Sequence, residues 1–110
     1  MAKSDKVVIL VTCGSAEDAG LIAEGLVEQR LAACVNVMES PVRSVYRWKD
    51  SVESSTEHLL FIKTARRLLP KVQAEVQRLH SYEVPEFIAL SIVAGSAPYL
   101  KWMDECLANR

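Results

Sequence analysis

Residues 7–13 form the feature that most constrains the fold, an apolar run that reads Val-Val-Ile-Leu-Val-Thr-Cys. β-Branched residues predominate in this run, and a strand built from it is apolar on both faces. Two later segments, 59–62 and 87–92, are also apolar on both faces. The sequence therefore predicts a sheet whose central strands are covered on two sides.

The segments between these strands have helical spacing. After Gly14, apolar residues recur every three or four positions and predict a helix that ends near Leu31. A second helix is expected to begin near Leu68, because Pro70 is tolerated only in a first turn. The remaining predicted elements are strands at 32–38, 42–49, 52–64 and 87–93, of which 42–49 and 52–64 form a long hairpin, and a helix after Gly95-Ser96.

This order of elements, βαββαβ with an extra C-terminal helix, predicts an α+β fold of the ferredoxin-like type, a split βαβ sandwich with an antiparallel sheet. Both main helices cover one face of such a sheet, so the other apolar face stays open. Because a monomer rarely exposes so large an apolar surface, we expect a tight homo-oligomer. Residues 1–110 are expected to form one domain, with residues 1–6 as a disordered polar tail.

Charge and cysteine content argue against several classes of protein. The 110 residues include 13 basic and 14 acidic side chains without a basic stripe, which disfavours a nucleic-acid binder. No segment approaches the ~20 apolar residues of a membrane span, and no signal peptide is recognisable. The three cysteines are widely spaced, so free thiols in a reducing, cytoplasmic compartment are expected.

The connector at 79–90 carries the densest group of titratable side chains. His80, Tyr82, Glu83 and Glu86 fall within seven residues around Pro85. A cysteine thiolate, an imidazole and a carboxylate together suit copper or zinc, so Cys13, His80 and Glu86 are candidate metal ligands. The alternative for His80 is a purely structural role at the end of a helix, where the helix dipole favours a histidine.

Two other functions remain open alternatives. A catalytic site would pair Cys13 or Cys34 with His80 as nucleophile and base, but no residue pattern supplies an oxyanion hole or an orienting third group. A small-molecule cleft would use aromatic side chains, which otherwise fill the core or a subunit interface. The aromatic candidates are Tyr46, Trp48, Tyr82, Tyr99 and Trp102.

Six blocks in order resemble the CutA family of divalent-cation tolerance proteins, and the resemblance runs from about Val7 to Leu107. The blocks are Val-Thr-Cys at 11–13, Leu-Ala-Ala-Cys-Val-Asn at 31–36, Ser-Val-Tyr-Arg-Trp-Lys at 44–49, Leu-Phe-Ile-Lys-Thr at 60–64, His-Ser-Tyr-Glu-Val-Pro-Glu at 80–86 and Tyr-Leu-Lys-Trp at 99–102. Two positions depart from the family pattern: Ser81 stands where proline is usual, and Asp50 where glycine often occurs.

The resemblance implies a ferredoxin-like subunit in a compact homotrimer, similar in architecture to the nitrogen-regulatory PII proteins. It also implies a cytoplasmic protein that is linked to tolerance of copper and other divalent cations, without an established catalytic activity. His80 and Glu86 match the histidine and glutamate of the proposed metal site. The cysteine of that site matches Cys13 in many members, and the position of Val11 in others.

The sequence thus predicts a non-enzymatic trimer that binds copper or another divalent ion weakly and folds without it. The alternative is a binding module whose inter-subunit clefts hold a small molecule or a partner protein, with Trp48, Tyr82 and Glu83 in the cleft. Neither nucleic acid nor a membrane is an expected partner.

Overall fold

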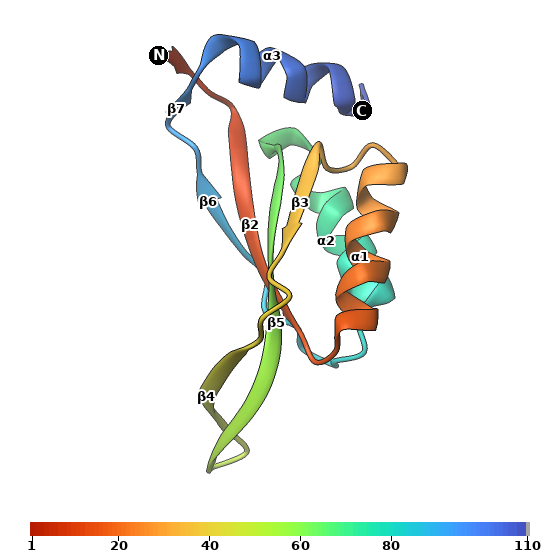
Figure 1. Ribbon diagram of the computed structural model, residues 1–110, viewed down its shortest axis with the longest axis vertical. Coiled ribbons are helices and arrows are strands. Elements are labelled where there is room, and N and C mark those ends of the chain that lie inside the picture. The colour runs from red at the N-terminus through yellow and green to blue at the C-terminus, as the bar shows by residue number, and fades with distance from the viewer. Residues whose placement is uncertain (110) are drawn as a thin grey trace.

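The computed structural model describes residues 1–109, which form one sheet layer with helices on one side and an additional helix across one end (Figure 1). The elements in chain order are β1 (Ala2–Lys3), β2 (Lys6–Cys13), α1 (Ala16–Glu28), β3 (Cys34–Val37), β4 (Val42–Trp48), β5 (Ser51–Ala65), a 3₁₀ turn (Arg66–Leu68), α2 (Leu69–Leu79), β6 (Ile88–Ser91), β7 (Ala94–Gly95) and α3 (Ala97–Cys106). No helix in this part of the chain has the length and apolar character that crossing a membrane requires.

The main sheet has the strand order β3-β5-β2-β6, and all of its pairs are antiparallel. With α1 after β2 and α2 after β5, this is the predicted ferredoxin-like arrangement. The predicted first and last core strands are direct neighbours, because Val7–Leu10 of β2 pair with Ile88–Ser91 of β6. The fold class predicted from the sequence is therefore confirmed.

One face of the sheet is buried under α1 and α2, which lie side by side on it (Figure 1). Alternate residues of β2 and β5 point into this core, and Ile9 and Ile62 are fully buried. The helices meet them with Ile22 and Leu26 from α1 and Val72 from α2. This alternation places every second apolar side chain of the central strands under the helices.

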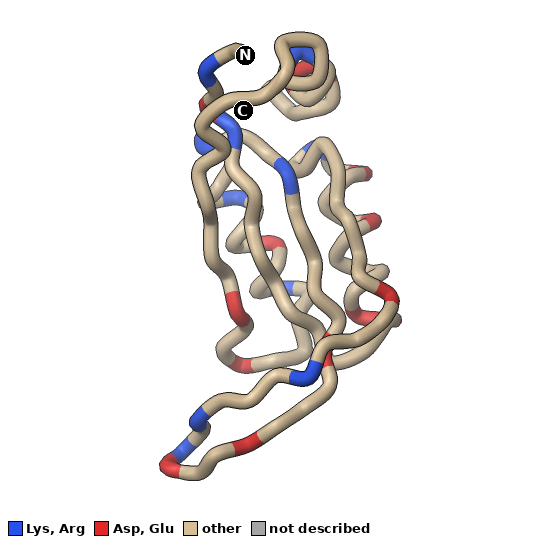
Figure 2. The backbone as a smooth tube through the Cα atoms, turned by 60° about the vertical axis from the view of Figure 1, so that its left-hand side comes forward, with Lys and Arg blue, Asp and Glu red and all other residues tan. Residues whose placement is uncertain are grey.

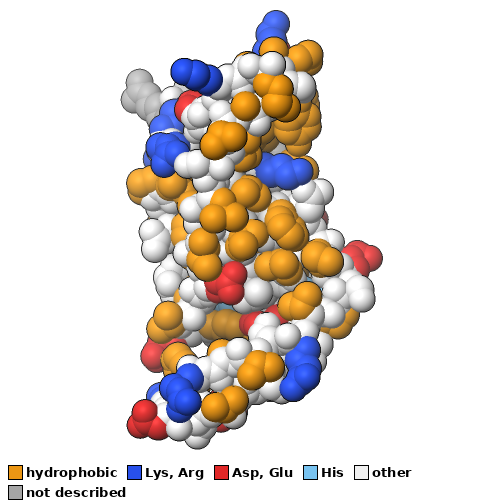
Figure 3. Space-filling model, turned by 90° about the vertical axis from the view of Figure 1, so that its left-hand side faces the viewer, with side chains coloured by type: hydrophobic (Ala, Val, Ile, Leu, Met, Phe, Trp, Pro, Cys, Tyr) orange, Lys and Arg blue, Asp and Glu red, His pale blue; other side chains and the backbone are white. Residues whose placement is uncertain are grey.

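The other face of the sheet carries apolar side chains that no helix covers. Val8 and Leu10 of β2 lie opposite Leu90 and Ile88 of β6, and Phe61 of β5 pairs with Leu10. Figure 3 shows hydrophobic side chains gathered along this face. The expectation of one covered and one open apolar face is thus met within a single chain.

The β4–β5 hairpin extends beyond the sheet as a two-stranded arm (Figure 2). Its two loop residues, Lys49 and Asp50, have φ values of 49° and 69°. Positive φ at both positions is the geometry of a type I′ turn, in which glycine is usual at the second position. Asp50 therefore occupies a left-handed conformation that costs less for glycine.

The N-terminal segment differs from the expected disordered tail. Ala2–Lys3 form β1, which pairs with β7 at Ala94–Gly95. Lys6 is buried, and its ammonium group contacts the carboxylates of Asp5 and Asp104. The polar composition of residues 1–6 gave no sign of these partners, because the partner strand and α3 lie about ninety residues away in the sequence.

Two helices begin with serine caps. The Ser15 hydroxyl accepts a hydrogen bond from the Asp18 amide at 3.1 Å, and Ser96 caps α3 through the Tyr99 amide at 3.3 Å. Helix α1 ends at Glu28 rather than near Leu31, because Arg30 takes up a positive φ of 60°. The following strand is correspondingly shorter than predicted and begins at Cys34.

Candidate functional site

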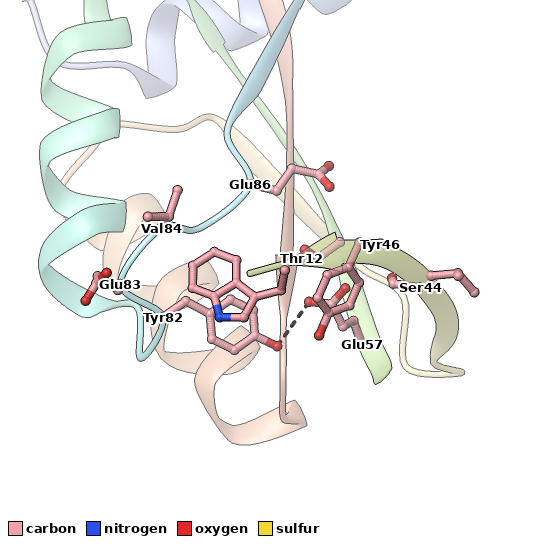
Figure 4. Close-up of a pocket in the computed structure, with 10 residues that line it drawn as sticks. Thr12, Ser44, Tyr46, Glu57, Tyr82, Glu83, Val84 and Glu86 are labelled. Carbon is pink, nitrogen blue, oxygen red and sulfur yellow. Dashed lines mark hydrogen bonds between the residues drawn. The ribbon is translucent and has the colours of Figure 1, made fainter. Parts of the chain in front are cut away.

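A pocket of about 590 Å³ opens where the hairpin leaves the sheet. Its walls come from the end of β2, the β4–β5 hairpin and the connector 80–87 between α2 and β6 (Figure 4). The lining residues are Thr12, Ser44, Val45, Tyr46, Trp48, Glu57, Tyr82, Glu83, Val84 and Glu86. Carboxylates and aromatic rings predominate, so the wall combines negative charge with apolar surface.

His80 fixes the connector to the sheet. Its Nε2 lies 2.7 Å from the Thr12 carbonyl oxygen, and its Nδ1 lies 3.0 Å from the Tyr82 amide nitrogen. Because a carbonyl only accepts and an amide N–H only donates, Nε2 carries the proton and Nδ1 accepts. The buried ring is therefore the neutral Nε2–H tautomer, with both nitrogens engaged by the backbone.

Two further contacts hold the connector against the helices. The Ser81 hydroxyl donates to Asp18 of α1 at 3.0 Å, and the Gln77 amide of α2 donates to the Glu83 carbonyl at 3.3 Å. Ser81 stands where the family pattern usually has proline. A proline there would lack this hydroxyl donor, so Ser81 supplies a contact to α1 in place of the rigidity of proline.

Tyr82 joins the connector to the hairpin. Its ring lies 4.6 Å from the His80 ring between centroids, and its hydroxyl donates to Glu57 Oε2 at 3.0 Å (Figure 4). Burial, together with the hydrogen bond to Glu57 and the charge of Glu57, raises the pKa of Tyr82 to about 12. A Cβ atom at Gly14 would lie 2.9 Å from the Tyr82 hydroxyl oxygen, so the absence of a side chain at Gly14 leaves room for the phenol.

Two carboxylates interact across the pocket. Glu57 on β5 is only 7% exposed, whereas Glu86 lies on the exposed side of the connector. Partial loss of hydration raises the pKa of Glu86, and repulsion from the Glu57 carboxylate acts in the same direction. This electrostatic coupling favours a positive charge between the two groups.

Cys13 lies outside the pocket wall, at the buried end of β2. Burial raises the pKa of its thiol to about 11, and the charges of Asp18 and Glu57 add to this effect. At neutral pH the group is a protonated thiol, whereas nucleophilic attack and metal coordination both require the thiolate.

The predicted ligands Cys13, His80 and Glu86 do not form one cluster within the chain. Residues 1–109 contain no group of three or more histidine, cysteine, aspartate or glutamate side chains placed to hold a metal ion. Cys13 is a buried thiol, and His80 would have to release a backbone hydrogen bond to bind an ion. This set therefore does not fit a preformed three-ligand centre in a single subunit.

The structure does bring together several of the candidate residues from the sequence. Trp48, Tyr82, Glu83 and Glu86 all line the pocket, although Trp48 precedes Tyr82 by 34 positions in the sequence. Tyr46 also lies in the wall. The aromatic candidates on α3, Tyr99 and Trp102, instead stack on each other at 5.3 Å between centroids.

The sequence analysis missed Glu57, Thr12 and Ser44. The useful signal for Glu57 was its position just before the apolar run that starts at Leu59. The pairing of Cys13 with His58 places Glu57 one position beyond the end of β2. A register for the predicted β2–β5 pair would therefore have identified a buried glutamate beside the candidate connector.

Comparisons with known proteins agree on one family. A family model described as "CutA1 divalent ion tolerance protein" matches residues 7–106. The "Divalent-cation tolerance protein CutA" of Thermus thermophilus is 46% identical over 98 residues, which cover 89% of this chain and 94% of that protein. The chloroplastic CutA of Arabidopsis thaliana is 41% identical over 103 residues, which cover 94% of this chain and 56% of that longer protein.

Solved structures give the same result for the fold. The divalent cation tolerance protein of Thermus thermophilus superposes with a TM-score of 0.91 at 44% identity, and the match covers 94% of this chain and 99% of that one. This agreement supports the fold described above.

Proposed function

The chain belongs to the CutA1 divalent ion tolerance family, and from this premise we propose that it is a non-enzymatic homotrimer that binds divalent cations weakly. The observation that carries the proposal is the carboxylate pair Glu57 and Glu86 in the pocket. One or two carboxylates with several retained waters suffice for weak binding of a divalent ion. The cytoplasm is the proposed compartment, in keeping with three free cysteines.

The open face of the sheet supports self-association. Leu10, Phe61, Ile88 and Leu90 form a continuous apolar surface along three strands, and a second sheet would remove it from water. Light scattering should give three times the 12.2 kDa mass of the chain. Replacing Leu90 with glutamate should dissociate the assembly, and a monomeric parent chain at micromolar concentration would contradict the proposal.

Two ligand sets are compared in the metal experiment. The pocket set consists of Glu57 and Glu86, and the set predicted from the sequence consists of Cys13, His80 and Glu86. Calorimetric titration with Cu(II), and separately with Mn(II), would use the variants Glu57→Gln, Cys13→Ser and His80→Gln. Glutamine at position 80 keeps one N–H donor and one acceptor but removes the imidazole.

We expect Glu57→Gln to weaken binding of Mn(II), the ion that prefers oxygen ligands, while Cys13→Ser leaves it unchanged. Weaker Cu(II) binding in Cys13→Ser and His80→Gln would instead support the set predicted from the sequence. Glu53→Gln, on the exposed hairpin, is the control for a lost charge. Unchanged affinity for both ions in every variant would contradict both ligand sets.

The second candidate function is a binding module that holds a small molecule. The pocket favours it, because its volume of about 590 Å³ lies within the usual range for small-molecule sites. An ordered organic molecule against Trp48 and Tyr82, in a crystal grown with candidate ligands, would support this function.

A further inference from the structure

The charge of the pocket has one sign. Glu57, Glu83 and Glu86 line it, and no lysine or arginine is among the lining residues. The chain as a whole is nearly balanced, with 13 basic and 14 acidic residues, so the excess negative charge is local. Clefts lined by one sign of charge concentrate ligands of the opposite sign. An anion such as a phosphate or a carboxylate would be repelled.

The two carboxylates that interact electrostatically are Glu57 and Glu86. Figure 4 shows Glu57 beside Tyr46 and Tyr82, Glu86 across from them on the connector, and Glu83 farther away along the connector. Glu57 already accepts a hydrogen bond from the Tyr82 hydroxyl, and this bond fixes the orientation of the Glu57 carboxylate. A carboxylate has about four acceptor positions, so one hydrogen bond leaves capacity for a donor on a ligand.

The aromatic residues favour the same sign of charge. Tyr46, Trp48 and Tyr82 line the pocket, and Trp48 is 45% exposed. The face of an aromatic ring attracts a cation within about 6 Å of its centroid, and tryptophan does so most strongly. The chain itself contains an example, because the Lys49 ammonium lies 5.8 Å from the centroid of a Trp48 ring.

The size of the pocket selects among cations. A bare divalent ion requires oxygen ligands that converge to about 2.0–2.6 Å, and residues 1–109 contain no group of three acidic, histidine or cysteine side chains placed to do this. A volume of about 590 Å³ is suited to a molecule of several non-hydrogen atoms. The water shell of a hydrated metal ion separates the ion from the aromatic rings, whereas the carbon substituents of an organic cation contact the rings directly.

We propose that this pocket binds a small organic cation, an ammonium compound held between Glu57 and Glu86 and covered by the rings of Tyr46, Trp48 and Tyr82. The proposal names the ligand class for the second candidate function, a small-molecule binding module, and rests on it. The ammonium group lies near the carboxylates, and its carbon substituents contact the rings.

The experiment compares two probes of the same shape with the full-length chain. Choline carries a quaternary ammonium, and 3,3-dimethyl-1-butanol replaces the nitrogen with carbon and is neutral. Calorimetric titration near neutral pH, up to about 10 mM probe to cover weak binding, should detect choline and at least tenfold weaker binding of the alcohol. The same titrations in the presence of Mg²⁺ test whether a metal ion competes for the carboxylates.

Two variants and a matched control identify the site. Glu86→Gln and Trp48→Leu should each weaken choline binding about three- to tenfold, the usual range for a lost charge or cation–π contact. Trp102→Leu is the control, because Trp102 is 41% exposed on α3, close to the 45% of Trp48, and lies outside the pocket wall. The Trp102 variant should bind like the parent chain.

The outcomes separate this proposal from the function on which it rests. Equal binding of choline and the neutral alcohol, lost in Trp48→Leu, would overturn the cation proposal and leave the small-molecule module standing. Absence of binding for both probes would overturn the cation proposal, and an ordered neutral molecule in the pocket would still support the module. An equal loss in Trp48→Leu and Trp102→Leu would place the binding elsewhere and overturn the assignment of the pocket.

Discussion

The two halves of β5 differ in burial and in strand partners. Residues 59–65 lie between β2 and β3, and alternate side chains such as Leu60 and Ile62 are fully buried. Residues 51–58 pair mainly with β4 in the hairpin arm and are largely exposed. One continuous strand therefore supplies the centre of the core at one end and a wall of the pocket at the other.

The difference shows how stability and binding chemistry are separated in this chain. The core half has apolar partners on both sides within the sheet and under the helices, so its sequence is constrained by packing. The arm has one strand partner, which leaves its polar side chains available to face a ligand. Glu57 lies at the boundary, where burial is deep enough to give a carboxylate a fixed position and an electrostatic effect on its neighbours.

The largest expected effect on stability comes from a substitution in the core half of β5. Ile62→Ala should lower the free energy of unfolding by about 2–5 kcal/mol, because a fully buried isoleucine leaves a cavity. Val52→Ala, in the arm and 67% exposed in the single chain, should change it by less than about 0.5 kcal/mol. Urea denaturation at one fixed protein concentration measures both variants. A cost for Val52→Ala close to that of Ile62→Ala would show that another subunit buries the arm.

The second-largest expected effect on stability comes from His80 in the connector, which lies next to the point where the two halves of β5 meet. His80→Ala should cost about 1–3 kcal/mol, because it leaves the buried Thr12 carbonyl and the Tyr82 amide without their ring partner. His80→Gln should recover part of this loss. Nitrogen NMR of the histidine side chains should show the Nε2–H tautomer. A protonated Nδ1 with a bare Nε2 would contradict the arrangement.

A smaller effect should appear at alkaline pH. The pKa of Tyr82 is raised from 10.0 to about 12, so the folded protein favours the neutral phenol. This contribution to stability is complete below pH 10 and is lost as the pH rises toward 12. The stability of the parent chain should therefore fall more steeply across this range than that of Tyr82→Phe. Parallel curves for the two proteins would refute the coupling of Tyr82 to Glu57.

The smallest effect is at the tip of the arm. Asp50→Gly should stabilise the protein by up to about 1 kcal/mol, because glycine adopts the φ of 69° without strain. Lys49→Gly changes the other residue of the turn, with a φ of 49°, and tests whether both positions contribute. Thermal unfolding monitored by circular dichroism measures the difference. A destabilised Asp50→Gly variant would mean that the aspartate makes a contact that outweighs the strain.

Periodicity predicted most of the core half from the sequence. The β2 run 7–13 and the segment 59–62 are apolar on both faces because one face meets the helices and the other lies open. The helix that begins with Pro70 in its first turn was also predictable, since proline restricts where a helix can start. These features depend on residues close together in the sequence.

The pocket was less predictable because it depends on register and on tertiary contacts. Nothing local to His80 indicates that its ring bonds the Thr12 carbonyl, 68 positions earlier in the chain. Glu57 looked like an ordinary polar residue of a hairpin, but it is buried and accepts a hydrogen bond from Tyr82, 25 positions later in the chain. The short pairing of β1 with β7 was missed for the same reason.

The imidazole of His80 also has a consequence for the edge of the sheet. Strand β6 begins at Ile88, which pairs with Leu10 of β2. The Thr12 carbonyl that binds His80 therefore lies beyond the end of the β2–β6 pairing. The ring supplies an N–H donor where the next strand would have supplied one. A vacant carbonyl at such a position is an attachment point for a strand of another molecule. By binding the Thr12 carbonyl, His80 removes one acceptor to which such a strand could pair.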